Sequence, residues 1–279
     1  MTEARTTPVT LSARPDMHFD FSGAPAIHHQ GNIYLSHFWN ALSLMAPTTE
    51  RGVIRAMRNV RKEIQDPRLR ADLDALLGQE GLHTRQHRRF NDHLATLGYD
   101  PRDAVERADR ELDSYLNRVD SRAALALAIA GEHVIYVLSH LLLMDERVCE
   151  GMDPEVRRLF EWHALEEIEH QSVAHDVYVH LFGDGPRHRW QHAKALKDAL
   201  EMLGRVGSAI FGSLVRSEPQ QDAKQLAAFV RFMVLTPGYG RVALAGVLRF
   251  LQPDFQPWKN SADLPMVEAT LVKLQAASA

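Results

Sequence analysis

The feature that most constrains this chain is the segment at residues 162–170, which reads Trp-His-Ala-Leu-Glu-Glu-Ile-Glu-His. Upstream of it Pro154 follows Asp153, and an N-cap residue followed by proline is typical of a helix start. Apolar residues recur at helical spacing on both sides of the acidic stretch, so the segment is predicted to be helical. On such a helix Glu167 and His170 lie one turn apart on the same face, where a carboxylate and an imidazole can bind one metal ion.

A second pair with the same spacing, Glu80 and His83, lies upstream in another helical pattern. One Glu-x-x-His pair arises easily by chance, but two pairs and two further glutamates match the ligand set of a di-iron or di-manganese carboxylate bundle. Glu50 is the first of these glutamates; it lies 16 residues before the turn at Asp66, and Glu80 lies 14 residues after that turn. At about 1.5 Å per residue, the two glutamates stand at nearly the same level if their helices pair antiparallel.

Glu132 is the second of these glutamates. It lies in segment 122–148, which is apolar nearly all round and is therefore predicted to be a buried helix. A buried carboxylate needs a partner or a metal ion. This helix ends some 16 residues after Glu132, and the next helix begins 13 residues before Glu167. These two glutamates are therefore also expected at nearly the same level along an antiparallel helix pair.

Four carboxylates and two imidazoles form the predicted metal site: Glu50, Glu80, His83, Glu132, Glu167 and His170. Hard oxygen donors with borderline nitrogen donors suit two divalent ions, iron in the first place, with manganese or zinc as alternatives. Two such ions would offset four negative charges, which explains how the group can be buried.

Three neighbours of the predicted ligands are candidates for a supporting role. His87 lies one turn after His83, His163 one turn before Glu167, and Tyr136 one turn after Glu132. Each could be an extra ligand, a hydrogen-bond partner or part of the pocket wall. Glu166 and Glu169 are expected on other faces of their helix, in contact with solvent or with arginine and lysine.

Composition narrows the classes of protein. A chain of 279 residues with 45% hydrophobic side chains can bury a sizeable core. The net charge of -4 gives no reason to expect a nucleic-acid partner, and the single Cys149 excludes an intrachain disulfide and cysteine-rich metal sites. The N-terminus lacks the apolar core of a signal peptide, and no run of 18 apolar residues predicts a transmembrane segment. We therefore expect a cytoplasmic protein.

The chain divides into three predicted parts. Residues 1–30 form an arm that contains an exposed pair, His28 and His29, and residues 31–183 form a four-helix metal-binding bundle. In the bundle, Pro47 is expected to separate a short helix from a second one that runs to about residue 65. Residues 99–120 then cross between the ends of the bundle.

Residues 184–279 form a predicted helical extension packed on the bundle, with helical patterns at 187–216, 222–235, 240–251 and 262–276 and a loop from Pro253. We expect these helices to cover the bundle or to form a homodimer contact. A peripheral contact with a membrane surface and a lid over the site are the alternatives.

Three segments resemble a bacterial family described as predicted metal-dependent hydrolases: residues 37–43 (His-Phe-Trp-Asn-Ala-Leu-Ser), 80–83 and 162–170. The likeness spans roughly residues 15 to 260. Because the motifs of that family are similar to those of ferritin-like di-iron proteins, the resemblance implies an all-α, ferritin-like four-helix bundle with an N-terminal arm and additional C-terminal helices. The family pattern has Pro-x-Gly-Glu before the second helix, whereas this chain has a threonine, Thr49, before Glu50.

The site leaves three hypotheses for the function, of which the two enzymatic ones are favoured. The preferred one is a di-iron enzyme that activates O2 to oxidise or oxygenate a small organic substrate, apolar in character. The alternative that the family resemblance implies is a two-metal hydrolase acting on an ester, amide or phosphate; it needs a cationic group near the metals, and Arg61, Arg85 and Arg88 are not clearly on the ligand face. The third is a non-catalytic protein that handles iron or binds metal for stability.

Overall fold

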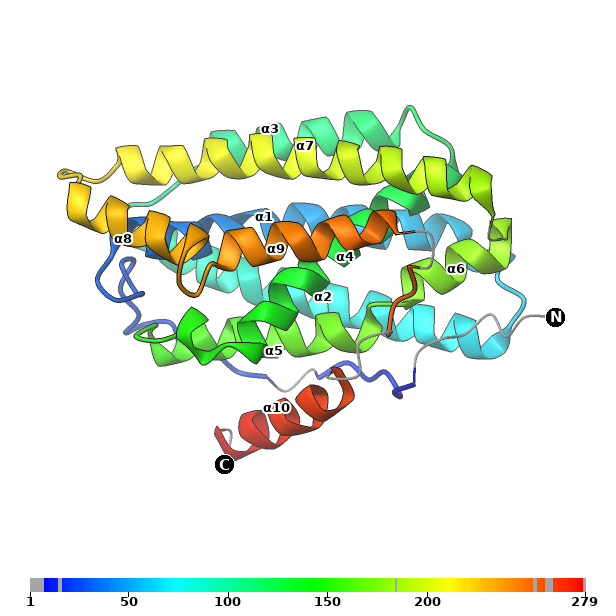
Figure 1. The fold of residues 1–279 in the computed structure, drawn as a ribbon, viewed down its shortest axis with the longest axis horizontal. Coiled ribbons are helices and arrows are strands. Elements are labelled where there is room, and N and C mark those ends of the chain that lie inside the picture. Colours follow the sequence, from blue (N-terminus) through cyan, green and yellow to red (C-terminus); the bar gives the residue numbers. More distant parts are fainter. Residues whose placement is uncertain (1–7, 15–16, 184, 253–254, 259–262, 278–279) are drawn as a thin grey trace.

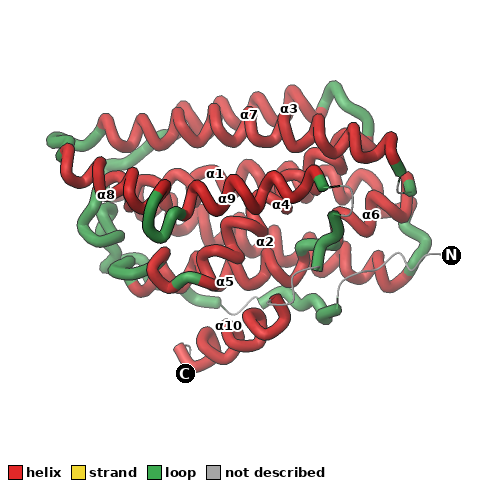
Figure 2. Tube along the Cα trace, viewed as in Figure 1, coloured by secondary structure: helices red, strands yellow, loops and turns green. Residues whose placement is uncertain are grey.

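The computed structural model describes residues 8–14, 17–183, 185–252, 255–258 and 263–277. These residues form helices joined by loops and contain no strand, only one isolated bridge between His29 and Met152 (Figures 1 and 2). The prediction of an all-α fold is therefore confirmed for the described part of the chain. Parts of the predicted arm (residues 1–7 and 15–16) and of the predicted tail (253–254 and 259–262) lie outside this description.

Four helices carry the six predicted ligands: α1 (Ile33–Val60), α2 (Pro67–Thr96), α4 (Ser121–Met144) and α5 (Pro154–His170). α1 packs against α2 and α4, and α5 packs against α4 and α2, so each helix has two neighbours within the group. Asp66 and Asp153 cap α2 and α5 as N-cap residues, each followed by proline, and this fixes where these helices begin.

α1 differs from the prediction, since it passes through Pro47 without a break. A proline inside a helix leaves the carbonyl oxygen four residues earlier without its donor, which here is the oxygen of Ser43. The side-chain amide of Asn91 on α2 donates to that oxygen at 3.1 Å. A residue far away in sequence therefore satisfies the group that Pro47 leaves free, and one continuous helix of 28 residues results.

The N-terminal arm follows the outer side of α2 and α5. Phe19 is buried there and lies 5.7 Å from the ring of Trp162. The prediction that His28 and His29 are exposed is wrong. Both rings are buried, His28 at hydrogen-bond distance from Asn40 and His29 packed edge-on against Phe232. These histidines are packing residues, and burial lowers the pKa of His28 to about 3.

The other helices surround the four that carry the ligands. They are α3 (Arg102–Leu116), α6 (Val173–Phe182), α7 (Pro186–Arg216), α8 (Ala223–Val234), α9 (Tyr239–Leu248) and α10 (Asp263–Ala277), with short 3-10 turns at Arg61–Glu63, Glu146–Val148 and Arg249–Leu251. α7 packs on α1 and α4, whereas α10 packs on α5 at the opposite edge (Figure 1).

α4 is the central element of this arrangement, and it contacts α1, α5, α6, α7 and α9. It is the one described helix that is long and apolar enough to cross a membrane, but more than half of its most apolar stretch is buried against these neighbours. A core helix of a globular protein has this same pattern.

Candidate metal centre

The structure brings the six predicted ligands together in the interior. α1 contributes Glu50, α2 contributes Glu80 and His83, α4 contributes Glu132, and α5 contributes the last two, Glu167 and His170. Each of the six is at most 2% exposed. Ionisable groups this deeply buried require partners or bound cations.

These residues and one more form two clusters, and within each cluster the donor atoms lie within 4.8 Å of one another. We call the first the His163 cluster; it contains Glu50, His83 and His163. The second, the His170 cluster, contains Glu80, Glu132, Glu167 and His170. His163, one of the three predicted neighbours, therefore stands beside the predicted ligands as a seventh donor.

The carboxylate of Glu167 lies between the two clusters. Its Oε1 is 2.8 Å from Nε2 of His163 and 3.4 Å from Nδ1 of His83. Its Oε2 is 3.2 Å from Nε2 of His170. One oxygen thus faces each cluster, which is the arrangement of a carboxylate that can bridge two ions.

The His170 cluster is held together around one nitrogen atom. Nε2 of His170 lies 3.3 Å from Oε1 of Glu80 and 3.2 Å from Oε2 of Glu132, in addition to its contact with Glu167. A single imidazole nitrogen can make one hydrogen bond, so it cannot satisfy three carboxylates.

The outer nitrogen of two histidines is fixed by a neighbour. Nε2 of His83 lies 3.1 Å from Oε2 of Glu166, a carboxylate that can only accept. Nδ1 of His170 lies 3.1 Å from the side-chain oxygen of Gln79, whose amide nitrogen donates to Glu169. Both outer nitrogens therefore carry a proton, and a neutral ring then has a lone pair on the inner nitrogen, facing the carboxylates.

A chain of hydrogen bonds fixes the third histidine in the same way. The hydroxyl of Ser43 donates to Oδ1 of Asn91, so its oxygen accepts from Nδ1 of His87, 2.9 Å away. Burial lowers the pKa of His87 well below its usual value, so its ring is neutral and Nε2 is an acceptor. That atom lies 2.6 Å from Nδ1 of His163, which must donate. Nε2 of His163 then has a lone pair directed at Glu167.

The donor atoms that face inward fit bound cations. Oε1 of Glu50, Oε1 of Glu80, Nδ1 of His83 and Oε2 of Glu132 are buried and lack a hydrogen bond of acceptable geometry. Lone pairs that face one another at 3–4 Å repel unless a proton or a cation lies between them. Native structures leave few buried polar atoms unpaired, so this concentration of unpaired atoms is consistent with a site that could hold cations.

Without cations, bound protons reduce part of the repulsion between the buried carboxylates. Burial raises the pKa of Glu50 to about 8, with the charges of Glu167 and Glu132 adding to the effect. Burial and the repulsion of Glu132 raise the pKa of Glu80 well above its usual range. Burial lowers the pKa of His170, but the surrounding carboxylates outweigh it and hold that pKa well above the ordinary value.

Glu166 and Glu169 were expected to contact either solvent or arginine and lysine, and the structure shows the contact with an arginine. Both are buried, and Arg14 of the N-terminal arm donates to both, at 3.0 Å to Glu166 and 2.6 Å to Glu169. Trp162 also donates to Glu166, at 3.2 Å. The sequence motif contains Glu166, but nothing local in the sequence connects it to Arg14, which lies 152 residues away.

Tyr136, the remaining predicted neighbour, lies elsewhere. Its hydroxyl donates to Asp263 of α10 at 3.1 Å, and its ring lines a separate cavity with His133 and Arg249. Gln79, Ser43 and Asn91, which orient the histidines, were not predicted. Each lies on a helix with a predicted ligand, but a serine, an asparagine or a glutamine in such a helix gives no signal of its own.

One of three comparisons with known proteins found a match. No curated protein and no solved structure matches the chain. A family model described as predicted metal-dependent hydrolase matches residues 13–261, which include both clusters. The chain therefore belongs to the family of predicted metal-dependent hydrolases.

Proposed function

We propose that this protein is a hydrolase that uses two divalent metal ions held by seven side chains. The His163 cluster would hold one ion, the His170 cluster the other, and Glu167 would contact both. The observation that carries the proposal is the orientation of three histidines. Each has its outer nitrogen in a hydrogen bond and its inner nitrogen turned toward carboxylate oxygens.

When bound, a pair of divalent ions polarises a carbonyl or phosphoryl oxygen and lowers the pKa of water. The chain's own residues do the positioning. Glu166, Gln79 and His87 each hold one histidine in the orientation and tautomer that a ligand needs. Thr84 donates to Oε2 of Glu50 at 2.7 Å, which leaves Oε1 of Glu50 turned to the cluster.

The family description favours hydrolysis over the O2 chemistry that the sequence pattern suggested to us. O2-dependent oxidation is the second candidate, and one observation favours it. Among the described residues, no arginine or lysine forms an ion pair with either cluster, and a hydrolase commonly uses such a cation to orient its substrate. Arg14 is bound to Glu166 and Glu169 on the outer side.

One experiment separates the two chemistries. The protein is loaded with Mn(II) or Zn(II) without O2 and tested for hydrolysis of 4-nitrophenyl esters and phosphates, and a second sample is loaded anaerobically with Fe(II) and then exposed to air. Hydrolysis that is lost on chelation and restored by metal supports the proposal. Consumption of O2 by the iron-loaded protein, with no hydrolysis under any loading, would contradict the hydrolase proposal and support O2-dependent oxidation. Glu167→Gln is the control for chemistry that does not come from the site.

A further inference from the structure

An apolar cavity of about 420 Å³ lies between α1, α4, α5 and α7. Its wall is mainly aromatic and aliphatic, with members such as Phe38, Trp39, Leu42, Leu138 and Phe160. A volume of several hundred Å³ with few polar groups is typical of a pocket for a small molecule. At roughly 30 Å³ per water-sized group, the cavity has room for about a dozen non-hydrogen atoms.

Two histidines in the wall of this cavity connect it to the metal centre. His87 and His163 both line it, and Thr49 precedes Glu50 on α1. The His163 cluster therefore borders the apolar space, and Glu167 lies 2.8 Å behind the imidazole of His163. A molecule in the cavity would place one end at this cluster and the rest of its length among apolar side chains.

We propose that this cavity binds the apolar part of an ester substrate and presents the ester group to the His163 cluster. This substrate assignment rests on the proposed hydrolase function. In the reaction a water oxygen bonds to the acyl carbon, the ester C–O bond breaks, and the alcohol leaves with a proton. The products are a carboxylic acid and an alcohol, one of which carries a chain of up to about a dozen carbon atoms.

α7 forms the outer side of the cavity. Gly204 and Ser208 line it and are exposed, so they mark its mouth. A Cβ atom at Gly204 would meet no other atom within 4 Å, so a larger side chain fits there and would occupy the entrance. Gly207, about one turn further, leaves less room for a side chain, because a Cβ atom there would lie 3.1 Å from Sδ of Met45.

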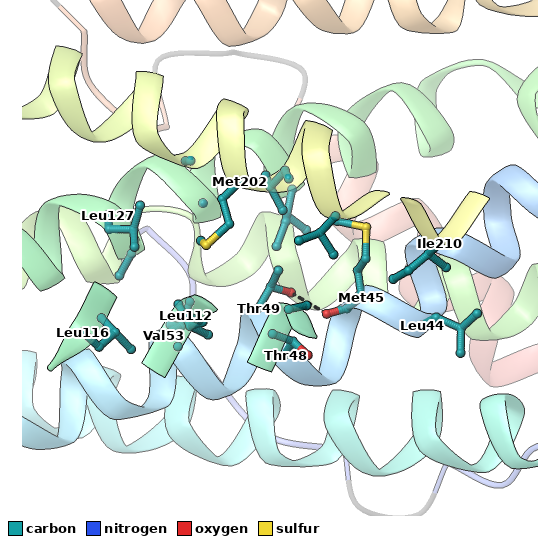
Figure 3. A pocket seen from close by; sticks show the side chains of 18 residues that line it. Leu44, Met45, Thr48, Thr49, Val53, Leu112, Leu116, Leu127, Met202 and Ile210 are labelled. Carbon is teal, nitrogen blue, oxygen red and sulfur yellow. Dashed lines mark hydrogen bonds between the residues drawn. The ribbon is translucent and has the colours of Figure 1, made fainter. Parts of the chain in front are cut away.

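A second, smaller cavity of about 60 Å³ lies beside the first, and Figure 3 shows the side chains that line it. The two share wall residues, among them Met45 and Leu203. In Figure 3 the side chain of Met45 extends from α1 toward α7 between the labelled Thr49 and Ile210. Met45 therefore lies in the wall between the two cavities.

The test measures binding of straight-chain alcohols from hexanol to tetradecanol by calorimetry, on the protein as purified. Affinity should rise about fourfold for each methylene and level off near twelve carbon atoms, when the cavity is full. Gly204→Leu should weaken the binding of dodecanol by tenfold or more. Ala209→Leu, which adds similar bulk at an exposed position of the same helix outside the cavity, should leave it unchanged.

Equal binding by Gly204→Leu and Ala209→Leu, or affinity that does not depend on chain length, would overturn the cavity assignment. Failure of the proposed function looks different. If alcohols bind as expected and no ester is hydrolysed, the cavity assignment is supported and the hydrolase function is contradicted. If esters are hydrolysed at rates that do not depend on chain length, the hydrolase function is supported and the cavity assignment is contradicted. Circular dichroism and melting of both variants confirm that they fold.

Discussion

The two clusters of the metal centre have different surroundings. The His163 cluster borders the apolar cavity through the ring of His163. No member of the His170 cluster lines that cavity; behind it Gln79 holds His170, and Gln79 in turn contacts Glu169, which binds Arg14. One position therefore borders an apolar cavity, and the other does not.

This difference indicates a division of labour between two positions with similar donors. A buried network that satisfies its members holds a site rigidly, which suits an ion that stays in place. A position beside an apolar cavity can meet a substrate away from bulk water, where electrostatic interactions are stronger. We therefore expect the His170 position to govern retention of metal and the His163 position to govern turnover.

The largest effect is expected for Glu167, because its carboxylate serves both clusters. Glu167→Gln removes the charge while keeping the shape, so metal content should fall from two ions per chain to well below one. Glu161→Gln is a matched control; Glu161 is buried on the same helix but pairs with Arg157 and Lys273, away from the clusters. Metal analysis of the dialysed proteins checks the result. Two retained ions in Glu167→Gln would show that the carboxylate bridges nothing.

The next largest effect separates the two positions. Glu132→Ala removes a donor from the His170 cluster and Glu50→Ala removes one from the His163 cluster. Each should lower the metal content to about one ion per chain, since each cluster binds one ion in our proposal. Glu132→Ala should also lower the melting temperature of the loaded protein more, because the retained ion stabilises the native state. Equal melting temperatures in the two variants would contradict the division of labour.

The sequence predicted most of the helices and the meeting of six side chains, because both follow from helical spacing. Glu50 and Glu80 were placed at one level by counting residues from the turn at Asp66, and the structure brings both into the centre. Their role as metal ligands stays a prediction. What the sequence missed depends on contacts between distant segments: Asn91 satisfies the carbonyl that Pro47 leaves free, and so it keeps α1 intact.

The same limitation explains the wrong expectations for single side chains. His28 was expected to be exposed because the segment around it is polar and rich in proline, but the arm packs the ring against Phe90. For Glu166 the sequence leaves solvent and a basic side chain as alternative partners, and it does not identify Arg14, which lies 152 residues away. Spacing along one helix predicts which side chains share a face, but not which other segment covers the remaining faces.

A moderate effect is expected from Ser43, which acts on the His163 cluster through His87. Ser43→Ala removes the acceptor of the His87 proton, so both imidazoles lose the fixed tautomer that aims Nε2 of His163 inward. The affinity of the His163 cluster for its ion should fall by about 10- to 100-fold, as for other residues that orient ligands. Ser36→Ala is the control, since Ser36 is a buried serine of α1 that accepts from the backbone of His29 instead. Competition with a chelating dye measures both affinities.

The smallest effect is a change of stability with pH in the metal-free protein. Burial raises the pKa of Glu50 to about 8 from an ordinary value near 4.5, and carboxylates raise the pKa of His170 despite its burial. Both groups bind more protons in the folded state, so the stability that Glu50 contributes is lost as the pH rises from about 4.5 to 8, and the stability that His170 contributes is lost above about pH 6.5. Buried histidines with lowered pKa values, such as His28 at about 3, change the stability only below about pH 6.5.

The melting temperature of the metal-free protein should therefore fall between pH 6.5 and pH 8, by about 2–4 °C for each kcal/mol of lost stability. Glu50→Gln should show a smaller fall, because one of the titrating groups is gone. The metal-loaded protein should show the opposite trend, since ions replace the protons and bind more tightly as the pH rises. Scanning calorimetry at both pH values checks all three proteins. A metal-free protein that melts at the same temperature at pH 6.5 and pH 8 would mean that the carboxylates of the two clusters do not share protons in its folded state.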